Sequence, residues 1–135
     1  MKNQHLDLFY LGVLFLLAGC RTTIDNLTPP QAPKNSSNIY TMTMAVHIPS
    51  RDRDAVRRNL RPFIIIDGKR QLMKGSELGQ NIFVHDHRLS DQRNEVNYYY
   101  ELEYDGDAGD KPTVRIEQSR LFSFQVSDRC ISSLE

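Results

Sequence analysis

The residues of this chain best suited to chemistry are two histidines separated by one residue, His85 and His87, with Asp86 between them. On an extended strand alternate side chains share a face, so both imidazoles are expected on one side and Asp86 on the other. Imidazole is a common zinc ligand, but a structural zinc site takes four ligands and no third partner can be assigned from the sequence. We therefore expect no metal and no cofactor. A metal-binding protein or small enzyme centred on the two histidines is the alternative.

Carboxylates form two further groups. Asp105, Asp107 and Asp110 lie in a glycine-containing stretch but lack the spacing and terminal glutamate of an EF-hand, so a solvated turn is favoured over a calcium site. Glu101 and Glu103 share the outward face of a strand, where like charges usually face water rather than flank a glycosidic bond. The sequence has no Gly-x-Ser-x-Gly elbow and no glycine-rich phosphate loop. It therefore predicts a protein that is not an enzyme.

The outward face of the longest predicted strand, 95–104, is the first candidate partner-binding surface. Tyr99 lies on this face together with Glu101 and Glu103. An outward aromatic ring beside carboxylates can stack on a sugar or pack against a partner protein. The charge of this surface predicts a basic partner.

The second candidate surface is the stretch 51–61, in which five arginines face two aspartates. Arg57 and Arg58 are adjacent and are the residues we expect to contact a partner. Such a basic stretch suits phosphate groups or an acidic partner, and a solvated loop with partly balanced charges is the alternative. Over the whole chain 17 basic and 17 acidic residues cancel, so nothing predicts a nucleic-acid partner.

Two stretches, 39–48 and 95–104, alternate between apolar and polar residues and predict strands with one dry face. His47 falls on the wetter face of the first strand, as a surface histidine. The residues expected to point inward are Tyr40, Met42, Met44, Val46, Ile48, Val96, Tyr98, Tyr100, Leu102 and Tyr104.

A β-hairpin is predicted around Asp67-Gly68, because this dipeptide suits the two positive φ values of a type I′ turn. Its first arm, 63–66, is apolar on both faces and belongs inside a sheet or between layers, whereas its second arm, 69–73, suits an edge. Further strands are expected over 82–84, 113–118 and 121–126, with a bend at Ser119-Arg120 that turns Phe122, Phe124 and Val126 inward.

Six or seven short strands and no long helix predict an all-β fold. Turn signals at near-regular intervals favour a two-sheet antiparallel sandwich of the immunoglobulin or fibronectin III type, with an open barrel as the alternative. The chain contains no tryptophan, so the core would consist of Tyr, Phe and aliphatic residues. The length suits one small domain.

The first 19 residues have the layout of a secretory signal peptide, with Lys2 and His5 ahead of an apolar run that ends at Leu17-Ala18-Gly19-Cys20. The twelve residues 8–19 are too few to span a bilayer, which takes about 20. The four-residue motif resembles the lipobox of bacterial lipoproteins. The resemblance implies that residues 1–19 are removed and that the thiol of Cys20 is acylated.

Residues 20–38 are then the lipidated N-terminus and a tether rich in proline, and 39–135 are the β-sandwich domain. Within the tether, Thr23 to Leu27 fits an edge strand and a plain linker about equally well. With Cys20 committed to lipid, Cys130 is the one remaining cysteine. We expect it to be a small buried hydrophobe rather than a reactive thiol or a bridge between chains.

The order of several short motifs is similar to a group of small bacterial lipoproteins with an immunoglobulin-like domain. These motifs are Asn26-Leu27-Thr28-Pro29-Pro30, Asn38-Ile39-Tyr40, the isoleucine-rich hairpin ending at Met73, the strand Tyr98 to Tyr104, and Leu121-Phe122-Ser123-Phe124. The resemblance implies no catalytic residues. It supports the fold and the membrane address only. Because no catalytic set is found in the sequence, we expect an exported, membrane-anchored lipoprotein that acts as a non-enzymatic binding or structural module of the cell envelope.

The partners expected for such a module are the membrane, through the N-terminal lipid, and an envelope protein or glycan. Arg21 follows Cys20 at the position where some inner-membrane lipoproteins carry Asp. By resemblance to that sorting rule, the outer membrane is favoured over the inner membrane.

Overall fold

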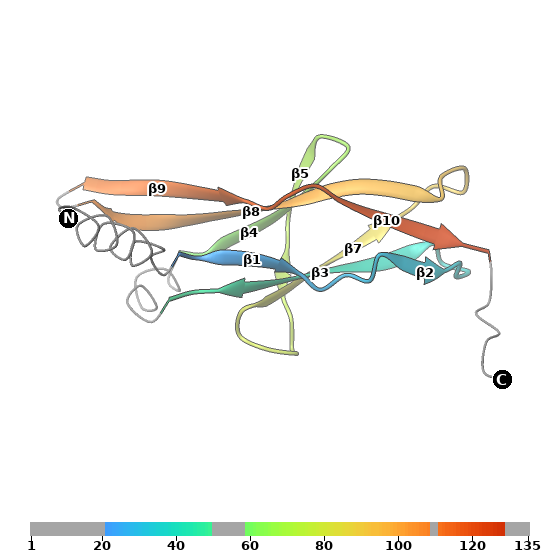
Figure 1. Ribbon diagram of the computed structural model, residues 1–135, viewed down its shortest axis with the longest axis horizontal. Helices are drawn as coiled ribbons and strands as arrows, with labels where there is room; N and C mark the ends of the chain where they lie inside the picture. The colour runs from blue at the N-terminus through green and yellow to red at the C-terminus, as the bar shows by residue number, and fades with distance from the viewer. Residues whose placement is uncertain (1–20, 50–58, 109–110, 129–135) are drawn as a thin grey trace, which may run out of the picture.

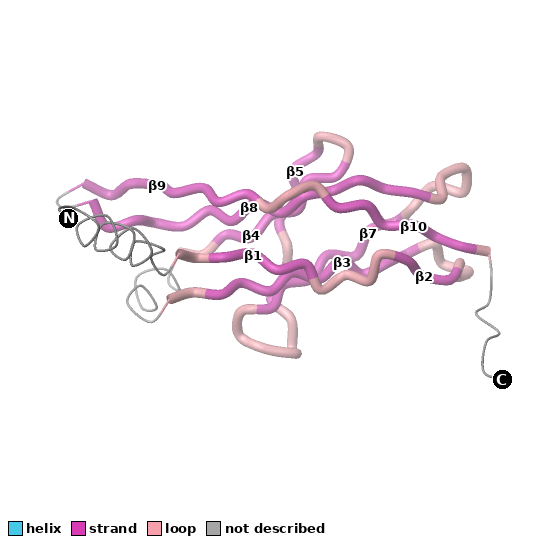
Figure 2. The backbone as a smooth tube through the Cα atoms, in the orientation of Figure 1, coloured by secondary structure: helices cyan, strands magenta, loops and turns pink. Residues whose placement is uncertain are grey.

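The computed structural model describes residues 21–49, 59–108 and 111–128, which form ten β-strands and no helix (Figures 1 and 2). The all-β prediction is confirmed. The predicted count of six or seven strands is too low, because three strands of two to four residues give little sequence signal. The strands are β1 (Thr23–Asn26), β2 (Gln31–Pro33), β3 (Ile39–His47), β4 (Arg61–Ile66), β5 (Lys69–Leu72), β6 (Lys74–Gly75), β7 (Ile82–Arg88), β8 (Glu95–Ala108), β9 (Lys111–Gln118) and β10 (Phe122–Ser127).

The strands form two sheets. One has the order β1-β3-β7-β6, and the other has the order β2-β10-β8-β4-β5, with β9 also paired to β8. In Figure 1 the long strands β8, β9 and β10 run above β1 and β3. All pairings are antiparallel except that of β10 with β2.

The core lies between the sheets and is made by the residues that the alternation predicted. On β3, Met42 and Met44 are fully buried, and on β8 so are Tyr100 and Leu102. The other predicted inward residues of both strands are at most 6 % exposed. His47 is exposed, as expected. Burial of one apolar face on each sheet is the main favourable contribution to the stability of the fold.

The hairpin between β4 and β5 is confirmed. Asp67 and Gly68 both have positive φ, 51° and 74°, as a type I′ turn requires. β4 lies between β8 and β5 in the sheet, and its three isoleucines, 64 to 66, are all buried, which explains why this arm is apolar on both faces.

Replacing Gly68 by valine is expected to lower the free energy of unfolding by about 1–3 kcal/mol, because a β-branched side chain is strained at positive φ. Thermal or urea unfolding of the purified protein measures this. Gly75→Val is the matched control: Gly75 has no positive φ, and a Cβ added to it would meet no atom within 4 Å, so a change within about 0.5 kcal/mol is expected. Equal stability of both variants would contradict the turn assignment.

The expectation of a tether is wrong for the described residues between 21 and 38. Thr23–Asn26 is an edge strand paired with β3, and Gln31–Pro33 pairs with β10 in the other sheet. Thr22 and Thr28 are buried, at 7 % and 6 % exposure. Residues 22–33 therefore belong to the folded domain, which the prediction began at residue 39.

The expected bend at Ser119-Arg120 is confirmed. The Ser119 N–H donates to the Tyr100 carbonyl, while the Ser119 hydroxyl accepts the Tyr100 N–H, at 2.9 Å in each case. In a regular antiparallel ladder the Tyr100 N–H would donate to the Ser119 carbonyl. Here it donates to the Ser119 hydroxyl instead, so the regular pairing stops and β9 ends at Gln118. After the bend Phe124 is buried and Phe122 is half-buried, so the inward face has shifted as predicted.

The predicted turn over 105–110 begins too early. β8 continues to Ala108 and β9 begins at Lys111, so Asp105 is a strand residue that pairs with Val114. Residues 109 and 110 lie outside the described part. Among the described residues no helix has the length and hydropathy needed to cross a membrane.

Candidate functional site

The predicted partner surface at Tyr99, Glu101 and Glu103 lies on the outer face of the β8 sheet, but its acidic groups are already paired. Arg70 on β5 donates from Nε to Glu101 at 2.7 Å and from Nη2 to Glu103 at 2.6 Å. Arg61 on β4 adds an ion pair to Glu103 at 2.9 Å. Pairing of β4 with β5 and β8 brings these arginines alongside.

These contacts change the character of that surface. The hydrogen bond from Arg70, with the nearby charge of Arg61, holds the pKa of Glu103 below its ordinary value. Glu101 is only 9 % exposed, so the expectation that it faces water is wrong. Tyr99 is half-buried. The acidic surface that was to attract a basic partner is therefore largely neutralised within the chain.

Several other predicted site residues lie outside the described residues. These are Cys20, Arg57, Arg58, Asp110 and Cys130. Of the basic stretch 51–61, Arg61 is described, and it pairs with carboxylates of β8. Asp105 accepts a hydrogen bond from Asn59 at 2.6 Å, so this aspartate belongs to a strand network rather than to a solvated turn.

His85 and His87 share one face of β7, as expected, with ring centroids 6.4 Å apart. They pair with Met42 and Tyr40 of β3, and residues directly opposite each other in an antiparallel pair share a face. Both imidazoles therefore lie on the core side of the sheet, half-buried at its margin. No group of three or more potential metal ligands occurs in the described parts of the chain.

Partial burial lowers the pKa of both His85 and His87, which makes the stability of the fold pH-dependent. The unfolded chain takes up these protons near the ordinary histidine pKa of about 6.5, whereas the folded chain takes them up only at lower pH. Their contribution is therefore complete above that pH and is lost as the pH falls through the folded-state pKa values.

We expect the melting temperature of the protein to fall between pH 7.5 and pH 5, and the double variant His85→Gln, His87→Gln to show a shallower dependence. His47→Gln, at an exposed position on the neighbouring strand, is the control and should follow the parent. Identical pH profiles for the parent and the double variant would contradict this assignment.

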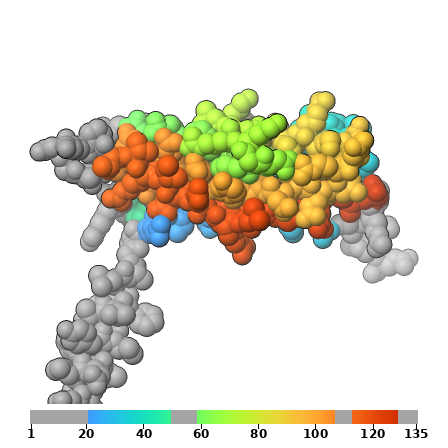
Figure 3. Space-filling model, turned by 90° about the horizontal axis from the view of Figure 1, so that it is seen from above, coloured from blue at the N-terminus to red at the C-terminus, as the bar shows by residue number. Residues whose placement is uncertain are grey.

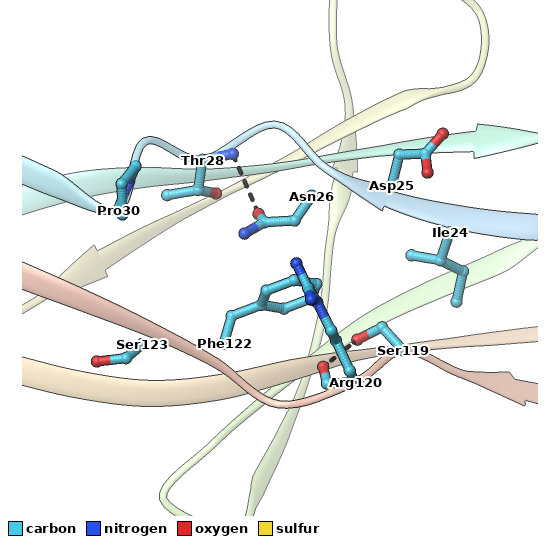
Figure 4. A pocket seen from close by; sticks show the side chains of 9 residues that line it. All are labelled: Ile24, Asp25, Asn26, Thr28, Pro30, Ser119, Arg120, Phe122 and Ser123. Carbon is cyan, nitrogen blue, oxygen red and sulfur yellow. Dashed lines mark hydrogen bonds between the residues drawn. The ribbon is translucent and has the colours of Figure 1, made fainter.

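An open cleft of about 590 Å³ lies between the segment that follows β1 and the segment that leads into β10 (Figure 4). Its walls come from chain segments almost a hundred residues apart. The lining residues are Ile24, Asp25, Asn26, Thr28 and Pro30 on one wall and Ser119, Arg120, Phe122 and Ser123 on the other.

Prolines at the start of β2 explain why the cleft is open. In the parallel ladder the Lys34 N–H donates to the Ser127 carbonyl, and the Gln125 N–H donates to the Pro30 carbonyl. In this pattern alternate residues 34, 32 and 30 would donate to the carbonyls of residues 127, 125 and 123, but Pro30 has no N–H to donate to Ser123. The ladder therefore ends, β2 begins at Gln31, and the edge of β10 beside Ser123 is left facing the cleft.

A buried polar network forms the inner side of the cleft and joins the two sheets. The Asn26 side chain donates to the Tyr98 hydroxyl at 3.1 Å and accepts from the Tyr100 hydroxyl at 3.0 Å. The Thr28 hydroxyl accepts the Thr43 N–H at 2.8 Å and lies 3.0 Å from the Tyr100 hydroxyl. Burial raises the pKa of Tyr100 far above its ordinary value. The Tyr100 hydroxyl is therefore a neutral hydrogen-bonding group. Through its contacts with Asn26 and Thr28 it holds the chain at the point where β1 ends.

Phe122 and Arg120 give the cleft its binding character. The Phe122 ring packs against Tyr98 and Tyr100, at centroid distances of 5.8 and 5.9 Å, and the Arg120 guanidinium lies 5.2 Å from the Phe122 ring centroid. Arg120 forms no ion pair among the described residues. In Figure 4 both side chains project toward the opposite wall. An aromatic face beside a guanidinium suits a ligand with both apolar and polar groups.

Sequence reasoning missed this cleft because its walls meet only in the folded chain. The two signals present were the adjacent prolines 29 and 30 and the bend at Ser119-Arg120. Each marks an interruption of regular pairing, but neither says that the two interruptions face each other.

Comparison with known proteins identifies no relative: no protein-family model, no curated protein and no solved structure matches the chain.

Proposed function

We propose that this protein is an exported lipoprotein, acylated at Cys20 and held at a membrane surface, preferentially the outer membrane. Its β-sandwich serves as a non-enzymatic binding or structural module of the cell envelope. The observation that carries the proposal is the apolar leader ending in Leu17-Ala18-Gly19-Cys20. A removable leader with a lipidated cysteine places the folded domain outside the cytoplasm without a spanning helix.

The strand order supports an immunoglobulin-like sandwich. One sheet has the order β1-β3-β7-β6, which corresponds to A-B-E-D of that fold, and β10-β8-β4 of the other corresponds to G-F-C. The cysteine and tryptophan markers of antibody domains are replaced by a core of Tyr, Met and Ile side chains.

The cleft beside Phe122 and Arg120 is the surface that we assign to a partner, either an envelope protein or a glycan. Phe122 offers a ring for an apolar side chain or a sugar face, and the guanidinium of Arg120 offers several N–H donors. Tyr99 on the neutralised outer face, and Arg57 and Arg58 of the basic stretch, remain proposed contacts of lower rank.

Two measurements test this proposal. The intact mass of protein extracted from membranes should correspond to residues 20–135 plus acyl chains, and the protein should partition into detergent. Photo-crosslinking from Ser123 in living cells should yield a specific partner. Loss of this crosslink in Arg120→Glu would locate the contact at the cleft, and loss on charge reversal of Arg57 and Arg58 would locate it at the basic stretch. Leu78, 79 % exposed on the loop between β6 and β7 of the other sheet and not among the residues that line the cleft, is the control crosslinking position. The same products from both positions would overturn the binding assignment.

A metal-binding protein or enzyme centred on His85 and His87 is the second candidate, favoured by their shared face and 6.4 Å ring separation. Metal content of protein purified without chelators distinguishes the two. Stoichiometric metal that disappears in the double alanine variant would replace the binding-module proposal.

A further inference from the structure

β9 is an edge strand with an exposed apolar surface. It pairs with β8 and with no other strand in the described ranges. Val114 and Ile116 on its outward face are 57 % and 56 % exposed. Figure 3 shows the orange β9 region at the molecular surface. An unpaired strand edge with exposed β-branched residues is a template for pairing with another strand.

The hydrogen-bond phase of β9 determines which backbone groups are free. The Ser119 N–H donates to β8, and β8 and β9 stay in one register from residue 118 back to residue 111. Because alternate residues of a strand direct their N–H and C=O to opposite sides, the odd-numbered residues face β8. The backbone groups of Val114, Ile116 and Gln118 therefore point to the open edge.

We propose that this edge binds the same edge of a second copy of the chain, antiparallel and centred on Ile116. Ile116 then lies opposite Ile116 of the second copy, and Val114 lies opposite Gln118. These are the residues whose N–H and C=O point outward, so they form about six backbone hydrogen bonds in the manner of an antiparallel ladder. The two β8 sheets become one continuous sheet.

Charge complementarity selects a second copy and this register. Arg115 and Glu117 flank Ile116 with opposite charges, so a twofold axis through Ile116 places each Arg115 across from Glu117 of the other copy, twice. A register centred on Val114 would place Pro112, which lacks an N–H, opposite Ile116. A register centred on Gln118 would pair Glu117 with Ser119 and lose both charge pairs.

The side chains at this edge are compatible with the pairing. The Arg115 side chain lies across Gly106 of β8, where a Cβ would come within 2.5 Å of Nε, but it is exposed and can turn toward Glu117 of the second copy. Glu117 already accepts hydrogen bonds from Arg21 at 2.6 and 3.2 Å. A carboxylate has about four acceptor positions, so Glu117 can accept from both arginines.

Cysteine crosslinking of the purified full chain tests the proposal. In an antiparallel hydrogen-bonded pair the Cα atoms are about 5.5 Å apart, within the range for a disulfide. Ile116→Cys in a Cys130→Ser background should therefore give a disulfide-linked dimer in several-fold higher yield than Leu72→Cys, an exposed position at the opposite sheet edge. Equal yields would overturn the proposal, as would a crosslink from Ile116→Cys to a different protein.

A charge exchange tests the register. Arg115→Glu should reduce the Ile116→Cys crosslink several-fold, and the double change Arg115→Glu, Glu117→Arg should restore it, because opposite charges again face each other. Failure of the double variant to recover, with its melting temperature unchanged from that of Arg115→Glu, would overturn this register. The crosslink does not depend on lipidation, so its failure is distinguishable from failure of the proposed anchor.

Discussion

Replacing Cys20 by serine is expected to abolish attachment of the protein to the membrane. Serine cannot form the thioether that carries the lipid, and one acyl chain alone gives only marginal binding, so stable anchoring requires about two signals. Loss of the acyl chains is therefore expected to remove the proposed anchor. Detergent partition and intact mass of the variant measure the effect.

Cys130→Ser is the matched control, because it removes the other cysteine of the chain and should leave partition and processing unchanged. If Cys20→Ser and the parent have the same leader-cleaved mass and partition alike, the lipoprotein proposal is wrong. Failure of both the parent and Cys130→Ser to partition into detergent would instead mean that the parent itself carries no lipid.

Replacing Phe124 by alanine is expected to lower the free energy of unfolding by about 3–5 kcal/mol, the usual range for removing a buried aromatic ring. Phe124 is 2 % exposed and packs on Tyr40 of the opposite sheet, with ring centroids 5.2 Å apart. The cavity would therefore open between the sheets at the point where β10 closes the sandwich. Urea unfolding with matched m-values measures the change.

Leu121→Ala provides the comparison three residues away. Leu121 is 66 % exposed, and truncation of an exposed side chain costs within about 0.5 kcal/mol. Equal destabilisation by both changes would mean that the bend at Ser119 does not determine which side chains of β10 point inward. The assignment of Phe124 to the core and of Leu121 to the surface would then be wrong.

The sequence predicted the central strands well because their signals are local. Alternation along 39–48 and 95–104 reports burial of one face directly, and the Asp67-Gly68 pair determines its own turn through backbone sterics. Each of these features needs only neighbouring residues. The structure confirms them as β3, β8 and the hairpin of β4 and β5.

The pairing of the Pro-rich segment cannot be predicted from the sequence because it is long-range. Residues 31–33 look like linker, yet they pair in parallel with β10, almost a hundred residues later. Proline is tolerated there because β2 is an edge strand. No local sequence pattern indicates a pairing partner so far away in the chain. The cleft beside Pro30 also depends on this long-range pairing, so the sequence does not predict it either.

The neutralised charge of the outer face of β8 cannot be predicted from the sequence, because alternation indicates which way a side chain points but not which side chains lie beside it. Glu101 and Glu103 do point outward, but Arg70 reaches them from β5 and also stacks on Phe63, 3.4 Å from the ring centroid. Which side chains lie across a sheet depends on strand order, and that order cannot be read from the period of one strand.

The early start of the fold limits how far an anchored domain can travel. Thr22 is buried, Arg21 is held by Glu117, and consecutive Cα atoms are only about 3.8 Å apart. If Cys20 carries the lipid as proposed, only one residue, Arg21, connects the lipidated cysteine to the first buried residue of the domain. The distance between the domain and the bilayer surface is then short and nearly fixed. Such a domain cannot bind partners that stay far from the membrane surface. It must meet those that diffuse in the same leaflet or that are brought down to the lipid surface.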